Sequence, residues 1–181
     1  MMEWIVTSSS ITEPVDKSDV KDLLGISQSN TAFDDQLDAM IVAAREWFEK
    51  RTALSVVSKD YKVRFEQEDC EDEWYELPFS PVNASPAITV NTTGITTTFQ
   101  QKGLKRVYIR PDDVVSTIVP GMPNEEYYVE ATFTAGEDNN SANECIKSIV
   151  VAMFTNKSTA VNVAYLPYTT IKLIDSLSVN L

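Results

Sequence analysis

The order of the predicted elements constrains the fold of this chain more than any other feature of its sequence. One amphipathic helical pattern covers residues 33–51, a second covers residues 143–156, and short strand patterns fill the segment between them. The strands are not separated by helices, which favours an antiparallel sheet over a parallel one. We therefore predict an α+β fold, in which N-terminal helices and a C-terminal helix pack with a small antiparallel β-sheet region.

Polar and glycine residues indicate where the helices begin and end. A short helix is expected within residues 14–26, stopped by Gly25 in the left-handed conformation, and another around residues 170–176. The residues expected to cap the helices are Asp16 with Asp19, Thr31 with Asp34, and Ser141 with Glu144. Arg45 lies toward the end of the helix at 33–51, where a cation complements the helix dipole.

Alternating apolar and polar residues predict the strands. Residues 61–65 have the alternation of a half-buried strand. Further strands are predicted at residues 74–77, 87–93, 95–100, 104–109 and 127–134, with Gln101-Lys102-Gly103 as a hairpin turn. We expect an N-terminal arm over residues 1–13, one domain over residues 14–175 and a C-terminal tail over residues 176–181.

The residue inventory excludes most kinds of active site. The chain has no histidine, so histidine-dependent triads, dyads and metal sites are impossible. Its two cysteines, Cys70 and Cys145, are far apart in sequence and form no zinc or dithiol motif. Phosphate-binding glycine motifs and a membrane-spanning apolar stretch are also missing from the sequence. We expect a protein without cofactor or catalytic activity, made in a reducing cytosol.

The charge of the chain is strongly negative. Fifteen basic and 27 acidic residues give a net charge of −12, which argues against binding DNA by neutralising its phosphates. The acidic residues concentrate in one stretch, at Glu66, Glu68, Asp69, Glu71, Asp72, Glu73 and Glu76. This stretch lacks the turn glycine of a calcium loop. A solvated loop, a patch that faces a partner, and a catalytic pair remain the alternatives.

A basic cluster lies on the predicted hairpin, at Lys102, Lys105, Arg106 and Arg110. Three roles are open for this cluster. It forms a solvated face of the hairpin, it contacts phosphates, or it supplies one half of a contact between copies of the chain. In the last case the basic cluster of one copy meets the acidic stretch of the next. Such a head-to-tail contact closes into a ring, and reversing the charges of Lys105 and Arg106 would weaken it.

Several segments, taken in order, resemble one known family. They are residues 15–26 (VDKSDVKDLLGI), 41–52 (IVAAREWFEKRT), 76–82 (ELPFSPV), 129–136 (VEATFTAG), 145–149 (CIKSI) and 166–167 (LP). This order of motifs resembles the head–tail connector, or head-completion adaptor, family of tailed bacteriophages. The resemblance covers residues 14–177.

The resemblance implies a structural virion protein. Family members form a ring, usually dodecameric, beneath the portal protein in the neck between capsid and tail. The ring extends the DNA channel and gives the next neck or tail-completion protein a docking surface. DNA passes without specific binding, so we expect Glu66, Glu68, Asp69, Glu71, Asp72 and Glu73, or Glu125 and Glu126, to face the channel. The family's C-terminal region commonly meets the portal, which makes Leu177, Val179 and Leu181 candidates for portal docking.

Three other functions remain as alternatives at this point. The chain would be another neck or tail-completion protein, an acidic monomeric module that inhibits a host protein, or an enzyme that uses carboxylates alone. The two strong helices favour the connector over a mainly β-stranded neck protein. Carboxylate catalysis needs two opposed acids in a cleft, and the sequence has no insertion that would form one.

Overall fold

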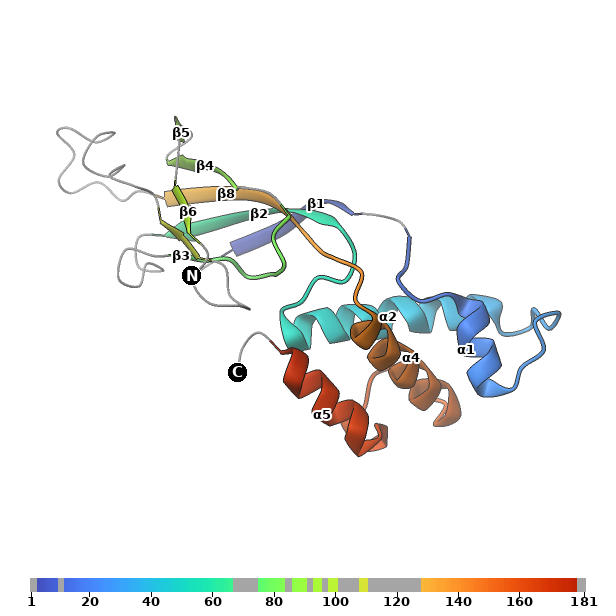
Figure 1. The fold of residues 1–181 in the computed structure, drawn as a ribbon. Coiled ribbons are helices and arrows are strands. Elements are labelled where there is room, and N and C mark those ends of the chain that lie inside the picture. Colours follow the sequence, from blue (N-terminus) through green and yellow to red (C-terminus); the bar gives the residue numbers. More distant parts are fainter. Residues whose placement is uncertain are drawn as a thin grey trace. The chain divides into compact units, whose positions relative to one another are not determined.

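The computed structural model confirms the α+β fold class and divides the chain into two compact units (Figure 1). The structure describes residues 3–9, 12–66, 75–83, 86–90, 93–95, 98–100, 108–110 and 128–178. One unit comprises Met1–Ser9 and Ser58–Gly136 and contains the strands. The other comprises Ser10–Val57 and Glu137–Leu181 and contains the helices.

The strand unit contains two antiparallel sheets among its described residues. The larger has five strands in the order β1-β2-β8-β4-β5, and the smaller has the order β3-β7-β6. The strands are β1 (Glu3–Ser9), β2 (Lys59–Glu66), β3 (Tyr75–Glu76), β4 (Ala87–Val90), β5 (Thr93–Ile95), β6 (Thr98–Gln100), β7 (Tyr108–Arg110) and β8 (Tyr128–Ala135). Figure 1 shows β1, β2, β8 and β4 side by side.

Strand alternation builds the core of this unit. Tyr61, Val63 and Phe65 of β2 are buried, as the alternation over residues 61–65 predicts, and the intervening side chains face outward. They pack with apolar residues of β8, β4 and the segment around β3. The Tyr61 ring stacks between Phe79 and Phe133, with centroid distances of 4.6 and 5.5 Å. Aromatic stacking therefore forms one end of this core.

The N-terminal segment contributes a strand rather than only an arm. Within residues 1–13, expected as an arm, Glu3–Ser9 forms β1 and pairs antiparallel with β2. Trp4, Ile5 and Val6 favour the extended conformation, and the ladder to β2 fixes it. The expected hairpin is also present as β6 paired with β7, although its turn lies outside the described residues.

Four α-helices and a short 3₁₀-helix form the described part of the helical unit. They are α1 (Lys17–Leu24), α2 (Asp34–Thr52), α4 (Asn140–Thr155), η2 (Val163–Tyr165) and α5 (Tyr168–Leu177). The apolar stripe of α4 is buried, and this helix contacts α1, α2 and α5 (Figure 1). Its buried residues join those of α2 in one core that includes Phe48, Ile146 and Ile149. The helices predicted at both ends of the chain are confirmed.

The helix ends confirm Asp16 as an N-cap, although its expected partner Asp19 pairs with Lys147 instead, and they correct two other caps. Asp16 caps α1 by accepting a hydrogen bond from the Ser18 backbone N–H at 2.7 Å, and Gly25 ends α1 at a φ of 67°. Helix α2 has no side-chain cap, so the prediction for Thr31 and Asp34 is wrong. Its N-cap residue is Phe33, whose ring packs edge-on against Phe154 at 5.5 Å. Apolar packing thus replaces a polar cap at this end.

The expected capping box of α4 is also wrong. The helix begins at Asn140, which puts Ser141 inside its first turn rather than at the cap. Asn139 is the N-cap, and its side-chain oxygen accepts a hydrogen bond from the Ala142 N–H at 3.0 Å. The Glu144 carboxylate instead accepts from Lys147 at 3.1 Å.

This cap makes a prediction that separates the two assignments. Asn139→Ala should lower the free energy of unfolding by about 1 kcal/mol, because an orphan N–H of the first turn loses its partner. Ser141→Ala should change it by less than about 0.5 kcal/mol. Urea denaturation followed by circular dichroism measures both. If Ser141→Ala lost more unfolding free energy than Asn139→Ala, the result would support the capping box and contradict the Asn139 cap.

Candidate functional site

Most of the residues predicted from the sequence as functional candidates lie outside the described part of the chain. Of the acidic channel candidates only Glu66 is described, at the end of β2; Glu76, the last residue of the acidic stretch, is also described and ends β3. Glu68, Asp69, Glu71, Asp72, Glu73, Glu125 and Glu126 lie outside the described residues, as do Lys102, Lys105, Arg106, Val179 and Leu181. Arg110 ends β7, and Leu177 ends α5. The channel, interface and docking assignments therefore remain predictions.

Glu66 belongs to a charged outer face of the sheet. The Arg64 Nε lies 2.9 Å from the Glu66 carboxylate, and the Arg64 guanidinium lies over the Tyr128 ring at 3.8 Å from its centroid. On the same face, the Lys62 ammonium pairs with Glu130 at 3.0 Å. Each cation on this face is paired with a carboxylate, so the face carries no concentrated charge of one sign.

The described residues contain no arrangement suited to catalysis or metal binding. No group of three or more acidic, cysteine or histidine side chains is placed to hold a metal ion in this part of the chain. Cys145 is fully buried, and burial raises the pKa of its thiol to about 11, so it is protonated at neutral pH. Cys70 lies outside the described residues. None of the described helices has the length and apolar character required to cross a bilayer.

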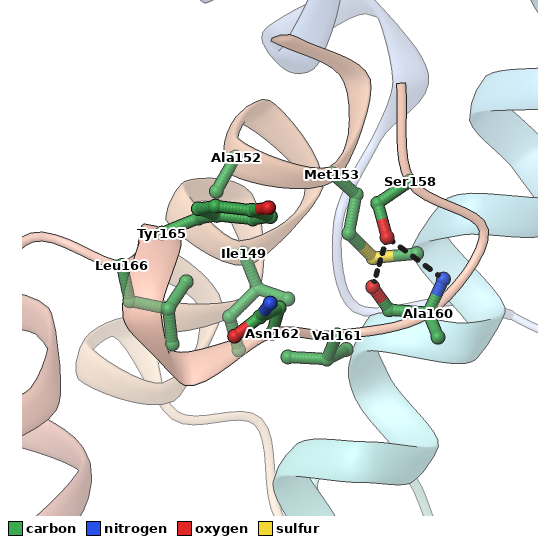
Figure 2. Close-up of a pocket in the computed structure, with 9 residues that line it drawn as sticks. All are labelled: Ile149, Ala152, Met153, Ser158, Ala160, Val161, Asn162, Tyr165 and Leu166. Atoms are coloured by element: carbon green, nitrogen blue, oxygen red, sulfur yellow. Dashed lines mark hydrogen bonds between the residues drawn. The ribbon is translucent and has the colours of Figure 1, made fainter. Parts of the chain in front are cut away.

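A small depression beside α4 is a packing feature rather than a ligand site (Figure 2). Figure 2 shows Ile149, Ala152 and Met153 of α4 beside Tyr165 and the segment from Ser158 to Asn162. The Ser158 hydroxyl donates to the Ala160 carbonyl at 2.6 Å and accepts from the Ala160 N–H at 3.3 Å, which folds this segment. The depression leaves essentially no room for a water-sized molecule. It therefore offers no binding volume for a ligand.

In the described part of the strand unit, the surface that stands out is the edge of the five-stranded sheet at β1, which pairs there with β2 alone. Trp4, Ile5 and Val6 are 46%, 59% and 44% exposed. The Trp4 ring continues the aromatic core, edge-on to Phe79 at a centroid distance of 4.9 Å. The apolar face of the sheet thus reaches this edge and stays uncovered there.

Asp60 anchors β1 in the sheet. Its carboxylate accepts hydrogen bonds from the Ser8 hydroxyl of β1 and from the Thr134 hydroxyl of β8. Both bonds lower the pKa of Asp60 below its usual range, and the bond from Ser8 has the larger effect. The Thr7 hydroxyl also donates to the Asp60 carbonyl at 3.1 Å. One aspartate of β2 therefore links three neighbouring strands and keeps the edge strand in register.

The helical unit carries its own exposed apolar side chains. Val163 and Tyr165 in η2 and Tyr168 at the start of α5 are exposed, Tyr168 by 72%. The Lys172 ammonium lies 5.5 Å from the centroid of the Tyr168 ring. These side chains lie between the end of α4 and the first turn of α5, a stretch in which the sequence pointed to no functional residue.

Sequence reasoning missed both exposed surfaces. The signal for β1 was present as three consecutive β-formers, Trp4, Ile5 and Val6, at the start of the chain. What the sequence did not reveal is that the strand lies at an edge. That position depends on the pairing of β2 with β8, whose residues are far apart in sequence.

Comparisons with known proteins find matches in fold alone. No protein-family model and no curated protein matches this chain. A chain described as "Neck of empty GTA particle computed with C6 symmetry" matches with a TM-score of 0.68 at 18% identity, covering 98% of this chain and 95% of that one. A chain from "Virion of native gene transfer agent (GTA) particle" has a TM-score of 0.68 at 19% identity and covers 97% of this chain and 94% of that one.

A third chain, from "Neck of native GTA particle computed with C12 symmetry", has a TM-score of 0.62 at 17% identity. It covers 96% of this chain and 94% of that chain. The likeness in each case spans nearly the whole of both chains. At these identities it shows a shared fold.

Proposed function

We propose that this chain is a structural protein of the neck of a phage-like particle. In this role it is a head–tail connector that forms a ring beneath the portal protein, extends the DNA channel and presents a docking surface for the next neck or tail-completion protein. The observation that supports it most is the fold shared with neck chains of gene transfer agent particles over nearly the full length of the chain. The order of sequence motifs led independently to a protein of the phage neck.

The chemistry of the chain supports a structural role. The described residues hold no metal cluster, and their cysteine is buried and protonated. The net charge of −12 suits a channel that DNA crosses without being held. An acidic surface does not displace the cations that surround the DNA phosphates, so the release of these cations does not favour binding. In this proposal the acidic stretch at residues 66–76, or Glu125 with Glu126, lines the channel.

The proposed partners follow from the same role. The ring is built from copies of this chain, twelve in the usual arrangement of the family it resembles. The basic cluster from Lys102 to Arg110 contributes to the contact between copies, and the tail with Leu177, Val179 and Leu181 meets the portal. The protein assembles in the host cytoplasm and resides in the virion neck.

Native mass spectrometry of the pure chain, alone and mixed with its cognate portal, tests this function. We expect a ring of about a dozen copies in at least one of the two samples, since closed cyclic assemblies arise from head-to-tail contacts. A chain that stays monomeric and ignores the portal would contradict the proposal. The acidic host-binding module would then be the hypothesis to test.

A further inference from the structure

The five-stranded sheet has two open edges. Among the described residues, β1 pairs only with β2, and β5 pairs only with β4. An open edge presents backbone N–H and C=O groups that can pair with another strand. Many proteins protect such edges with lysine, proline or a covering loop. The segment from Trp4 to Ser9 has neither lysine nor proline.

The β1 edge also exposes apolar area that an added strand would cover. Trp4 and Val6 lie opposite Val63 and Tyr61 in the ladder, on the buried face of the sheet, yet both are nearly half exposed. The register shifts between Val6 and Ser8, so the regular part of the edge is Glu3–Val6. The edge thus offers a short, regular and apolar stretch of backbone.

Charge points to a second copy of the chain as the occupant. Each copy carries a net charge of −12, so two copies approach each other at a lower electrostatic cost through uncharged stretches than through the rest of their acidic surfaces. No charged residue lies between Glu3 and Glu13, the segment that contains most of β1. None lies between Glu76 and Lys102 either, the segment that contains β4 and β5. Both open edges therefore belong to uncharged stretches of an otherwise acidic chain.

The strand directions favour a head-to-tail contact between these edges. Each neighbouring pair in the order β1-β2-β8-β4-β5 is antiparallel, so β1 and β5 run in the same direction. We infer that the β5 edge of one copy pairs in parallel with the β1 edge of the next, joining neighbours in the ring by strand addition. Two different edges meet in this contact, which makes it heterologous and able to close into a ring. The inference rests on the proposed function, because it specifies how that ring is built.

Ile5→Lys tests this contact. Ile5 is 59% exposed and lies opposite Lys62, on the outer face, so the substitution leaves the core intact while placing a charge on the edge. Leu23→Lys in α1 is the matched control, because Leu23 is also 59% exposed but lies in a helix without a free backbone edge. Circular dichroism verifies that both variants fold. Native mass spectrometry at equal chain concentrations measures assembly, with the portal added if the wild type needs it.

We expect Ile5→Lys to raise the chain concentration needed for the ring by about tenfold or more, and Leu23→Lys to assemble as the wild type does. Hydrogen exchange at the backbone amides of Glu3–Val6 should slow by at least about tenfold in the wild-type ring relative to the monomer. A ring that forms with Ile5→Lys and leaves these amides unprotected overturns the inference but keeps the proposed function. A dimer joined through β1, or protection of β1 by the portal alone, also overturns it. If the wild type forms no ring under either condition, the proposed function fails and this inference with it.

Discussion

Replacing Arg45 by methionine should lower the free energy of unfolding by about 3–5 kcal/mol. Arg45 is buried in α2 and donates hydrogen bonds to two carboxylates. Its Nε lies 2.8 Å from Glu13, and its Nη1 lies 2.9 Å from Glu49, which is itself buried. Burial lowers the pKa of the guanidinium, but the bonds and charges of Glu13 and Glu49 outweigh burial and raise it. Removing the cation leaves a buried carboxylate without its counter-charge.

A matched control and a double variant separate this cause from a general loss of charge. Arg51→Met, which removes an exposed arginine 3.8 Å from Asp175, should cost less than about 1 kcal/mol. Adding Glu49→Gln to Arg45→Met should recover part of the loss, because it removes the uncompensated charge. The glutamine oxygen can still accept the Val56 N–H that Glu49 accepts at 3.0 Å. Urea denaturation measures all three variants, and equal losses for Arg45→Met and Arg51→Met would contradict this account.

The same residue shows where sequence reasoning reaches its limit. The sequence placed Arg45 on a helix correctly, because an amphipathic stripe is a local signal. It assigned the charge to the helix dipole, however, whereas the structure pairs Arg45 with Glu13, distant in sequence. The cap of α1, in contrast, was predicted correctly, because Asp16 and the Ser18 N–H that it accepts from are only two residues apart in sequence. Local signals in the sequence therefore predicted where the helices lie, whereas the pairing of residues that are distant in sequence was not predicted.

The candidate site follows the same division. The alternation over residues 61–65 identified β2, but the edge at β1 depends on which strands pair, and alternation does not specify pairing. The organisation into two units was equally hidden, because each unit is assembled from segments that lie apart in the sequence. Sequence reasoning looked for function in clusters of charge. The exposed apolar edge instead became visible only once the sheet was assembled.

Replacing Tyr61 by alanine should also lower the free energy of unfolding by about 3–5 kcal/mol. Its side chain is among the largest that are fully buried. Removal leaves a cavity between Phe79 and Phe133, whose ring centroids lie 4.6 and 5.5 Å from that of Tyr61. Aromatic pairs of this kind add about 0.5–1.5 kcal/mol beyond the buried area. Tyr168→Ala, at a residue that is 72% exposed, should change stability by less than about 0.5 kcal/mol.

Tyr61 also supports the edge strand, which connects this core to the proposed assembly. Tyr61 lies opposite Val6 in the ladder, and its ring lies 6.3 Å from the ring of Trp4. In Tyr61→Ala the amides of β1 should therefore exchange faster than the wild-type amides, measured in the monomer under native conditions. Ile5→Lys leaves this aromatic cluster in place, so it should accelerate exchange in the monomer less than Tyr61→Ala does, although it sets a second lysine opposite Lys62. If Tyr61→Ala lost stability while β1 kept its protection, the aromatic cluster would not be what holds the edge in place, and Asp60 would carry that role instead.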